Sequence, residues 1–164
     1  MYCREYIQNH EDDPEAKTLV AKAARLMGAT HIYIHDDMKA ALKCYEYVIA
    51  RYQDSDCLES SDEVIKAFLD KNYCLSRLEN RQESFKCRGE AINLLRNSPY
   101  PTIQIKVILL YVERIEHFNN QSDIETARQL MSELKTQFQD SPHKETQREL
   151  DLALTYLQLK MKPI

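Results

Sequence analysis

Apolar residues recur along this chain at the spacing of amphipathic α-helices, not at the strict alternation of β-strands. Ile65 and Phe68 begin one apolar face, and Ile108 and Tyr111 begin another. Steps of three and four residues bring side chains to the same side of a helix. The chain has only two glycines and five prolines among its 164 residues, so tight turns are poorly supplied. The pattern predicts an all-α protein.

The helical pattern repeats with a period of 43 residues. The small residues Ala41, Ser84 and Ala127 occupy one position of the repeat. A second apolar position of the repeat is filled by Val48, Ala91 and Leu134. A single helical hairpin cannot bury both of its faces, so repeats of this kind must stack. We expect one domain over residues 1–164, with repeats at about 14–54, 60–97 and 99–140 and a terminal helix at about 142–160.

Polar residues that favour helix starts divide the pattern into seven segments. We expect residues 1–12 either to fray or to continue a helix of a preceding repeat. The predicted starts are Asp13-Pro14-Glu15, His35-Asp36-Asp37, a capping box of Ser60 with Glu63, Asn80 with Glu83, Ser98-Pro99, Ser122 with Glu125, and Ser141-Pro142.

Composition excludes several classes of function. The formal net charge is −4, which argues against a general nucleic-acid binder. No apolar run is long enough to span a membrane, and the first residues lack the apolar core of a secretory signal. The five cysteines include no closely spaced pair, so we interpret them as small buried hydrophobic residues of a reduced compartment. We therefore predict a cytoplasmic protein with no membrane or nucleic-acid partner.

No set of residues has the spacing of a catalytic or cofactor site. His31 and His35 lie four residues apart beside Asp36 and Asp37, which could suggest a divalent metal. His31, however, stands in the apolar-stripe position that Leu75 holds later, so a packed histidine explains it better. A glycine-rich phosphate loop and a nucleophile elbow are absent from the sequence. We predict no catalytic, cofactor-binding or metal-binding residues.

The segment Ala41-Leu42-Lys43-Cys44-Tyr45, with Met27-Gly28 in the helix before it, resembles the tetratricopeptide repeat. The resemblance covers about residues 14–160. The usual repeat has about 34 residues, so this chain resembles a long-repeat variant found in bacterial arrays. It departs from the family where Asn72 and Ile115 replace the small residue Gly28, and the first pair carries one additional residue between its helices. The resemblance implies a right-handed α–α superhelix of three hairpins and a C-terminal capping helix.

The resemblance also implies a binding surface, because the first helix of each hairpin lines the concave side in this family. Carried over residue by residue, the candidate partner-binding set is Lys22, Arg25, Tyr33, Lys66, Tyr73, Arg77, Glu116 and Asn120. A basic strip with tyrosines would suit an acidic peptide or a C-terminal carboxylate. The lysine and asparagine set of the carboxylate-clamp subfamily is not reproduced. The alternative is that these residues are ordinary solvated charges and rim aromatics.

These features predict a non-catalytic protein–protein interaction module or scaffold. One alternative is a regulatory domain that senses a peptide and controls an effector. An enzyme built on a helical scaffold is a third reading, and it would require a deep polar pocket with perturbed pKa values. Self-association through the terminal helices also remains open.

Overall fold

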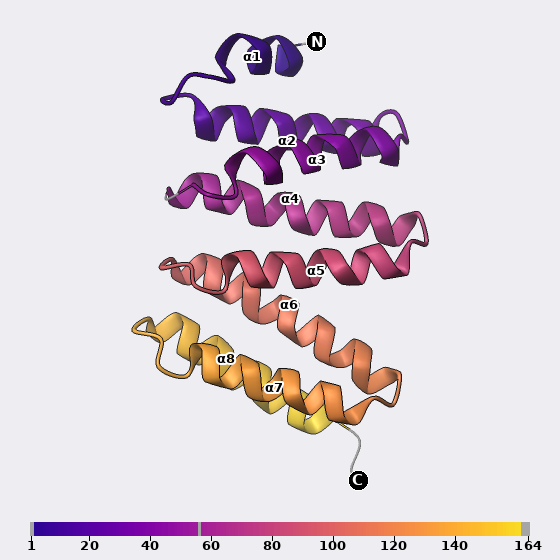
Figure 1. The fold of residues 1–164 in the computed structure, drawn as a ribbon, viewed down its shortest axis with the longest axis vertical. Coiled ribbons are helices and arrows are strands. Elements are labelled where there is room, and N and C mark those ends of the chain that lie inside the picture. Colours follow the sequence, from indigo (N-terminus) through magenta and orange to yellow (C-terminus); the bar gives the residue numbers. More distant parts are fainter. Residues whose placement is uncertain (1, 56, 162–164) are drawn as a thin grey trace. The chain divides into compact units, whose positions relative to one another are not determined.

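The computed structural model describes residues 2–55 and 57–161, and this part of the chain folds into eight α-helices (Figure 1). In chain order they are α1 (Tyr2–His10), α2 (Lys17–Tyr33), α3 (Met38–Tyr52), α4 (Leu58–Arg77), α5 (Arg81–Leu95), α6 (Pro101–Asn120), α7 (Ile124–Phe138) and α8 (Lys144–Lys160). The all-α prediction is confirmed. None of the helices within the described ranges is both long and apolar enough to cross a membrane.

The chain divides into two compact units, Met1–Gly89 and Glu90–Ile164, with the boundary inside α5. In the first unit α2 packs against α1, α3 and α4, and α3 also packs against α4. In the second unit α6 packs against α7 and α8, which also contact each other. Within each unit the packing is from neighbour to neighbour, as in stacked helical hairpins. The assignment of all residues to one domain stays a prediction.

The turns that precede α4, α6 and α8 share one set of hydrogen bonds at intervals of 43 residues. The hydroxyls of Ser55, Ser98 and Ser141 each accept the backbone N–H two residues on, at 3.3–3.4 Å. The carbonyl of each serine accepts a side-chain donor six residues on, namely Ser61 Oγ at 3.2 Å, Gln104 Nε2 at 2.8 Å and Gln147 Nε2 at 2.8 Å. The repeat read from the sequence is therefore present in the hydrogen bonds of the fold.

The turns that follow α2, α4 and α6 repeat as well. Each contains one residue with a left-handed backbone, at Asp36 (φ 50°), Glu79 (φ 57°) and Ser122 (φ 64°). The next residue caps the following helix through its side-chain oxygen, which accepts a backbone N–H three residues on. The pairs are Asp37 with the Ala40 N–H at 2.9 Å, Asn80 with the Glu83 N–H at 3.4 Å, and Asp123 with the Thr126 N–H at 3.2 Å. The predicted cap at Asn80 is confirmed, and within the predicted segment His35-Asp36-Asp37 the capping residue is Asp37. The prediction of Ser122 was wrong by one residue, because Ser122 makes the left-handed turn and Asp123 caps α7.

The additional residue of the first hairpin is confirmed in its turn. The Asp37 N–H reaches back six residues to the carbonyl of His31, at 2.9 Å. In the second hairpin the Asn80 N–H reaches back only five residues, to Leu75, also at 2.9 Å. The additional residue of the first hairpin therefore lies between His31 and the left-handed residue Asp36. The helix that follows keeps the 43-residue repeat.

Several helix starts predicted from sequence were wrong. The helix α2 begins at Lys17 and not at Pro14, and α6 begins at Pro101 and not at Pro99. The capping box of Ser60 with Glu63 does not form, because α4 already begins at Leu58 after an extended Cys57. Residues 2–10 form the helix α1, which packs on α2.

Small residues let the two helices of a hairpin approach closely. The repeat positions Ala41, Ser84 and Ala127 are all buried, as the pattern predicts. At Gly28 the approach is close as well, because an added Cβ would lie 2.6 Å from Cε1 of the buried Tyr45 ring. In the next hairpin Asn72 replaces this glycine, and its side-chain amide lies 2.6 Å from Ser84 Oγ.

Candidate functional site

The helices α2 and α4 lie side by side in the first unit and are joined along a polar seam. Arg25 Nε of α2 donates to Glu63 Oε2 of α4 at 2.7 Å, and Arg25 Nη1 lies 3.1 Å from Asp70 Oδ2. At the start of the seam, Thr18 Oγ1 and Ser60 Oγ are 2.9 Å apart. Ser60 and Glu63, predicted to cap a helix, therefore connect two helices instead.

The Arg25 side chain is only 17% exposed and holds α2 and α4 together. The Glu63 side chain is only 6% exposed, so its charge needs a partner close by. Burial by itself would lower the pKa of Arg25, but the hydrogen bonds to Glu63 and Asp70 outweigh it and raise the pKa. The guanidinium remains charged and is paired with these two carboxylates.

Lys66 is also paired with carboxylates of α4. Its Nζ lies 2.6 Å from Asp62 Oδ2 and 3.1 Å from Glu63 Oε1. The hydrogen bond to Asp62 is the main cause that raises the pKa of Lys66. Two of the candidate cations thus face three carboxylates of α4. Lys22 and Arg77 are exposed, and neither forms an ion pair with another residue in the described part of the chain.

Large apolar side chains lie on the same exposed side of α2 and α4. Leu19, Leu26 and Tyr33 follow one another at seven-residue intervals on α2 and are 57%, 43% and 79% exposed. Tyr73 of α4 is 44% exposed. Residues seven apart lie two turns along the same side of a helix. We call this surface the α2–α4 face: Leu19, Lys22, Leu26 and Tyr33 of α2 with Lys66, Tyr73 and Arg77 of α4.

The sequence interpretation missed Leu19 and Leu26 because it selected polar and aromatic residues. A signal was present, since Leu19, Leu26 and Tyr33 share a stripe that lies away from the buried stripe of Val20, Ala24 and Gly28. A leucine stripe outside the core stripe marks a helix with two apolar sides, of which the hairpin covers only one.

The remaining two candidates belong to α6 in the second unit. Glu116 Oε1 accepts a hydrogen bond from the Tyr156 hydroxyl of α8 at 2.5 Å, and this bond raises the pKa of Tyr156. Asn120 is exposed at the end of α6. Six of the eight candidate residues therefore lie on α2 and α4. One of these six, Arg25, belongs to the polar seam between the two helices. Glu116 lies in the second unit and takes part in a separate contact between α6 and α8.

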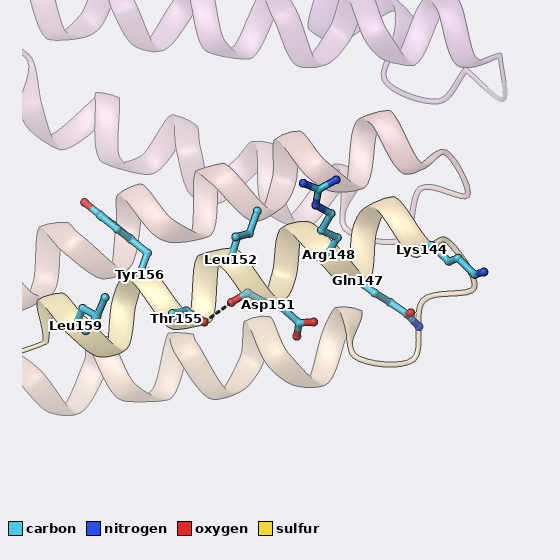
Figure 2. Close-up of a pocket in the computed structure, with 8 residues that line it drawn as sticks. All are labelled: Lys144, Gln147, Arg148, Asp151, Leu152, Thr155, Tyr156 and Leu159. Atoms are coloured by element: carbon cyan, nitrogen blue, oxygen red, sulfur yellow. Dashed lines mark hydrogen bonds between the residues drawn. The ribbon is translucent and has the colours of Figure 1, made fainter.

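The outer side of α8 forms a second exposed surface, an open hollow in the second unit (Figure 2). The sequence places Leu150, Ala153, Leu154 and Leu157 on an apolar side of this helix; all are buried except Leu154, which is half-buried. The hollow is lined by Lys144, Gln147, Arg148, Asp151, Leu152, Thr155, Tyr156 and Leu159. Leu152 and Leu159, which the sequence interpretation did not single out, are 56% and 82% exposed.

Three of the five cysteines are buried, as expected for small hydrophobic residues: Cys44, Cys74 and Cys87. Burial raises the pKa of Cys74 to about 11. The prediction was wrong for Cys57, which is exposed and donates to Glu59 Oε2 at 2.8 Å. Its position in the turn before α4 puts it beyond the reach of the core.

The histidine pair shows no arrangement for a metal ion. The rings of His31 and His35 are tilted, with centroids 5.7 Å apart. Within residues 2–55 and 57–161, His, Cys, Asp and Glu side chains form no group of three or more that could hold one.

We compared the chain with protein-family models, with curated proteins and with solved structures, and none of the three comparisons found a match.

Proposed function

We propose that this protein is a tetratricopeptide-like solenoid, a right-handed α–α superhelix of helical hairpins, that acts as a non-catalytic interaction module. Its α2–α4 face binds a segment of a partner protein. The stacked hairpins and the 43-residue period of both turn types support the solenoid. The resemblance of Met27-Gly28 and Ala41–Tyr45 to the tetratricopeptide repeat supports the choice of family.

The single observation that carries the binding proposal is the exposure of Leu19, Leu26, Tyr33 and Tyr73 on adjacent helices. Apolar side chains grouped on one surface and bordered by charges are typical of protein-binding sites. Full burial of one large apolar side chain contributes about 1.5–3 kcal/mol. Several such anchors are needed to offset the loss of rotational and translational freedom on association.

The charges of the face define what kind of segment it suits. Because Asp62, Glu63 and Asp70 neutralise Arg25 and Lys66, the face is not a strongly basic strip. Lys22 and Arg77 remain as separate cations. The partner segment is therefore held mainly by apolar side chains, with a carboxylate at Lys22 or Arg77 adding orientation more than affinity.

The test is an affinity enrichment from a lysate of the source organism, with wild-type protein and a Leu26→Ser/Tyr73→Ser variant. Leu78→Ser is the matched control, because Leu78 is 41% exposed in the same unit but lies at the end of α4. Circular dichroism must first show equal helix content. We expect a protein that wild type and Leu78→Ser retain and the face variant loses. Equal retention by all three would place the binding site elsewhere.

A further inference from the structure

We propose that the segment bound by the α2–α4 face is an amphipathic α-helix of another protein, which carries a carboxylate beside its apolar side chains. The inference rests on the function proposed above and specifies the conformation and the charge of the bound segment. It is supported by the spacing of large and small side chains along α2, by the carboxylates of α4, and by the charge of Lys22.

The C-terminal half of α2 has the form of a hole that receives one side chain of a facing helix. Such a hole is made by four residues at positions i, i+3, i+4 and i+7, here Leu26, Ala29, Thr30 and Tyr33. The large residues at its two ends are 43% and 79% exposed, and between them Ala29 is small and half-buried. The Thr30 hydroxyl donates to the Leu26 carbonyl at 3.0 Å, so it needs no further acceptor. We call this site the Thr30 hole, and the exposure of its two ends leaves it open to a side chain from outside.

A second hole, which we call the Lys22 hole, precedes the Thr30 hole and shares Leu26 with it. It is made by Leu19, Lys22, Ala23 and Leu26, and Leu19 is 57% exposed. The two holes are seven residues apart, which is about 10 Å along the helix at about 1.5 Å per residue. A helix that runs along α2 places side chains at that same interval. An extended segment rises about 3.3 Å per residue and turns every second side chain to one face, so its side chains recur at about 7 Å and miss the second hole.

The two helices also lack free carboxylates that could accept hydrogen bonds from the backbone of an extended segment. The helix α2 contains no aspartate or glutamate. Every carboxylate of α4 already has a partner: Glu59 with Cys57 Sγ, Asp62 with Lys66, and Glu63 and Asp70 with Arg25. An extended segment would bury backbone N–H groups without a partner here, whereas a helix satisfies most of its backbone N–H groups internally. The face therefore suits a helix.

The charge of Lys22 determines which charge the bound helix carries. Lys22 is exposed and forms no ion pair with any residue that the structure describes. The turns that flank the two helices carry carboxylates beyond the helix ends, at Glu15, Asp36, Asp37 and Glu79. Lys22 stands inside α2, so a carboxylate of the bound helix is its natural partner. The face of a second copy is a poor source of this group, because its α2 has no carboxylate and those of its α4 are already paired.

Three designed peptides test the proposal by fluorescence anisotropy. Each is an end-capped 21-residue peptide based on alanine and glutamine, with three leucines at seven-residue intervals. The first carries a glutamate three residues from the central leucine, made in two versions, before and after it. The second carries a lysine there, and the third carries the glutamate together with a central proline, which breaks the helix. We expect the first peptide to bind at least about tenfold more tightly than the third and at least about fivefold more tightly than the second. The net charge of −4 would by itself favour the second peptide, so the opposite order indicates a local contact with Lys22.

Paired variants of the protein, first shown by circular dichroism to be equally helical, locate the contact. Thr30→Leu fills the Thr30 hole and should weaken binding of the first peptide at least about tenfold. Thr155→Leu is the matched control and should leave binding unchanged, because Thr155 is an exposed threonine of α8 whose hydroxyl also donates to the carbonyl four residues back, at 2.8 Å. Lys22→Glu should reverse the preference between the first two peptides. Arg148→Glu makes the same change of charge at an exposed arginine of α8 and should not reverse it.

Equal binding of the first and third peptides, an unchanged affinity in Thr30→Leu, or no binding of any peptide at about 1 mM would overturn the inference. The proposed function has a separate outcome, because the lysate enrichment with Leu26→Ser/Tyr73→Ser does not depend on the conformation of the partner. Sedimentation velocity and flotation with phosphatidylcholine–phosphatidylserine vesicles test the other occupants, and we expect a monomer that remains unbound to vesicles. Dimerisation or vesicle binding that Leu26→Ser abolishes would assign the face to a second copy or to a membrane and overturn the inference.

Discussion

Removal of the Arg25 guanidinium tests whether this residue is a structural link or a solvated cation of a binding groove. The change is Arg25→Met, which keeps much of the side-chain volume and removes the charge. Its partner Glu63 is 6% exposed and sits 2.7 Å from Arg25 Nε. A solvated surface cation could be removed at a cost within about 0.5 kcal/mol. A link to a buried carboxylate costs considerably more.

The expected magnitude follows from the two contacts. A hydrogen bond to a charged group contributes about 1.5–3 kcal/mol, which applies to the bond with Glu63. The Asp70 side chain is 36% exposed, so that pair is worth about 0–1 kcal/mol. Lys66 Nζ remains 3.1 Å from the other Glu63 oxygen and still neutralises it, so the loss stays below the roughly 3–5 kcal/mol of an unpaired buried charge. We expect a loss of about 2–3 kcal/mol.

The assay is urea-induced unfolding followed by circular dichroism, in a double-mutant cycle of Arg25→Met with Glu63→Gln. The cycle should show a coupling of at least about 1 kcal/mol, because both changes act on one hydrogen bond. Arg77→Met is the matched control, since Arg77 is exposed and makes no ion pair within the described residues. A loss for Arg25→Met as small as that for Arg77→Met would refute the structural interpretation.

Three other substitutions and one chemical modification have expected outcomes. Gly28→Val should reduce the free energy of unfolding by about 1–3 kcal/mol, because a Cβ there would lie 2.6 Å from the buried Tyr45 ring; an unchanged urea midpoint would contradict that contact. Asp123→Ala should cost about 1 kcal/mol by removing the cap of α7. Ser122→Gly should cost nothing or stabilise, because Ser122 has φ 64°; the opposite order of these two would restore Ser122 as the cap. Iodoacetamide at pH 8 should modify the exposed Cys57 far faster than the buried Cys74, because a pKa of about 11 leaves Cys74 with about 100-fold less thiolate than its ordinary pKa of 9.0 would. Mass spectrometry of tryptic peptides measures the two rates, and equal rates would contradict the burial of Cys74.

The repeat could be predicted from sequence because it depends on side chains that occur at fixed intervals. Ala41, Ser84 and Ala127 mark a close approach of helices, and such positions tolerate few residue types. The turns follow the same period, so the segment His35-Asp36-Asp37 and the residue Asn80 could be predicted to cap helices. Each of these features is local, or repeats a local feature.

The helix starts and the binding surface depend on contacts between distant segments, which pattern alone does not contain. Ser60 and Glu63 have the spacing of a capping box, yet Thr18 and Arg25 of another helix bind them. Arg25 and Lys66 stand at positions predicted to line a binding groove, yet carboxylates of α4 already pair with them. The exposed leucines of α2 and α8 were overlooked because the candidate binding residues were chosen among polar and aromatic side chains.

The central claim is that the α2–α4 face binds a partner protein, and the most direct measurement is a calorimetric titration of the enriched partner with wild type, Leu26→Ser and Leu78→Ser. The account predicts a Kd at least about tenfold weaker for Leu26→Ser, because that side chain is buried on binding, and an unchanged Kd for Leu78→Ser. Equal Kd values for all three proteins, at equal helix content, would contradict it.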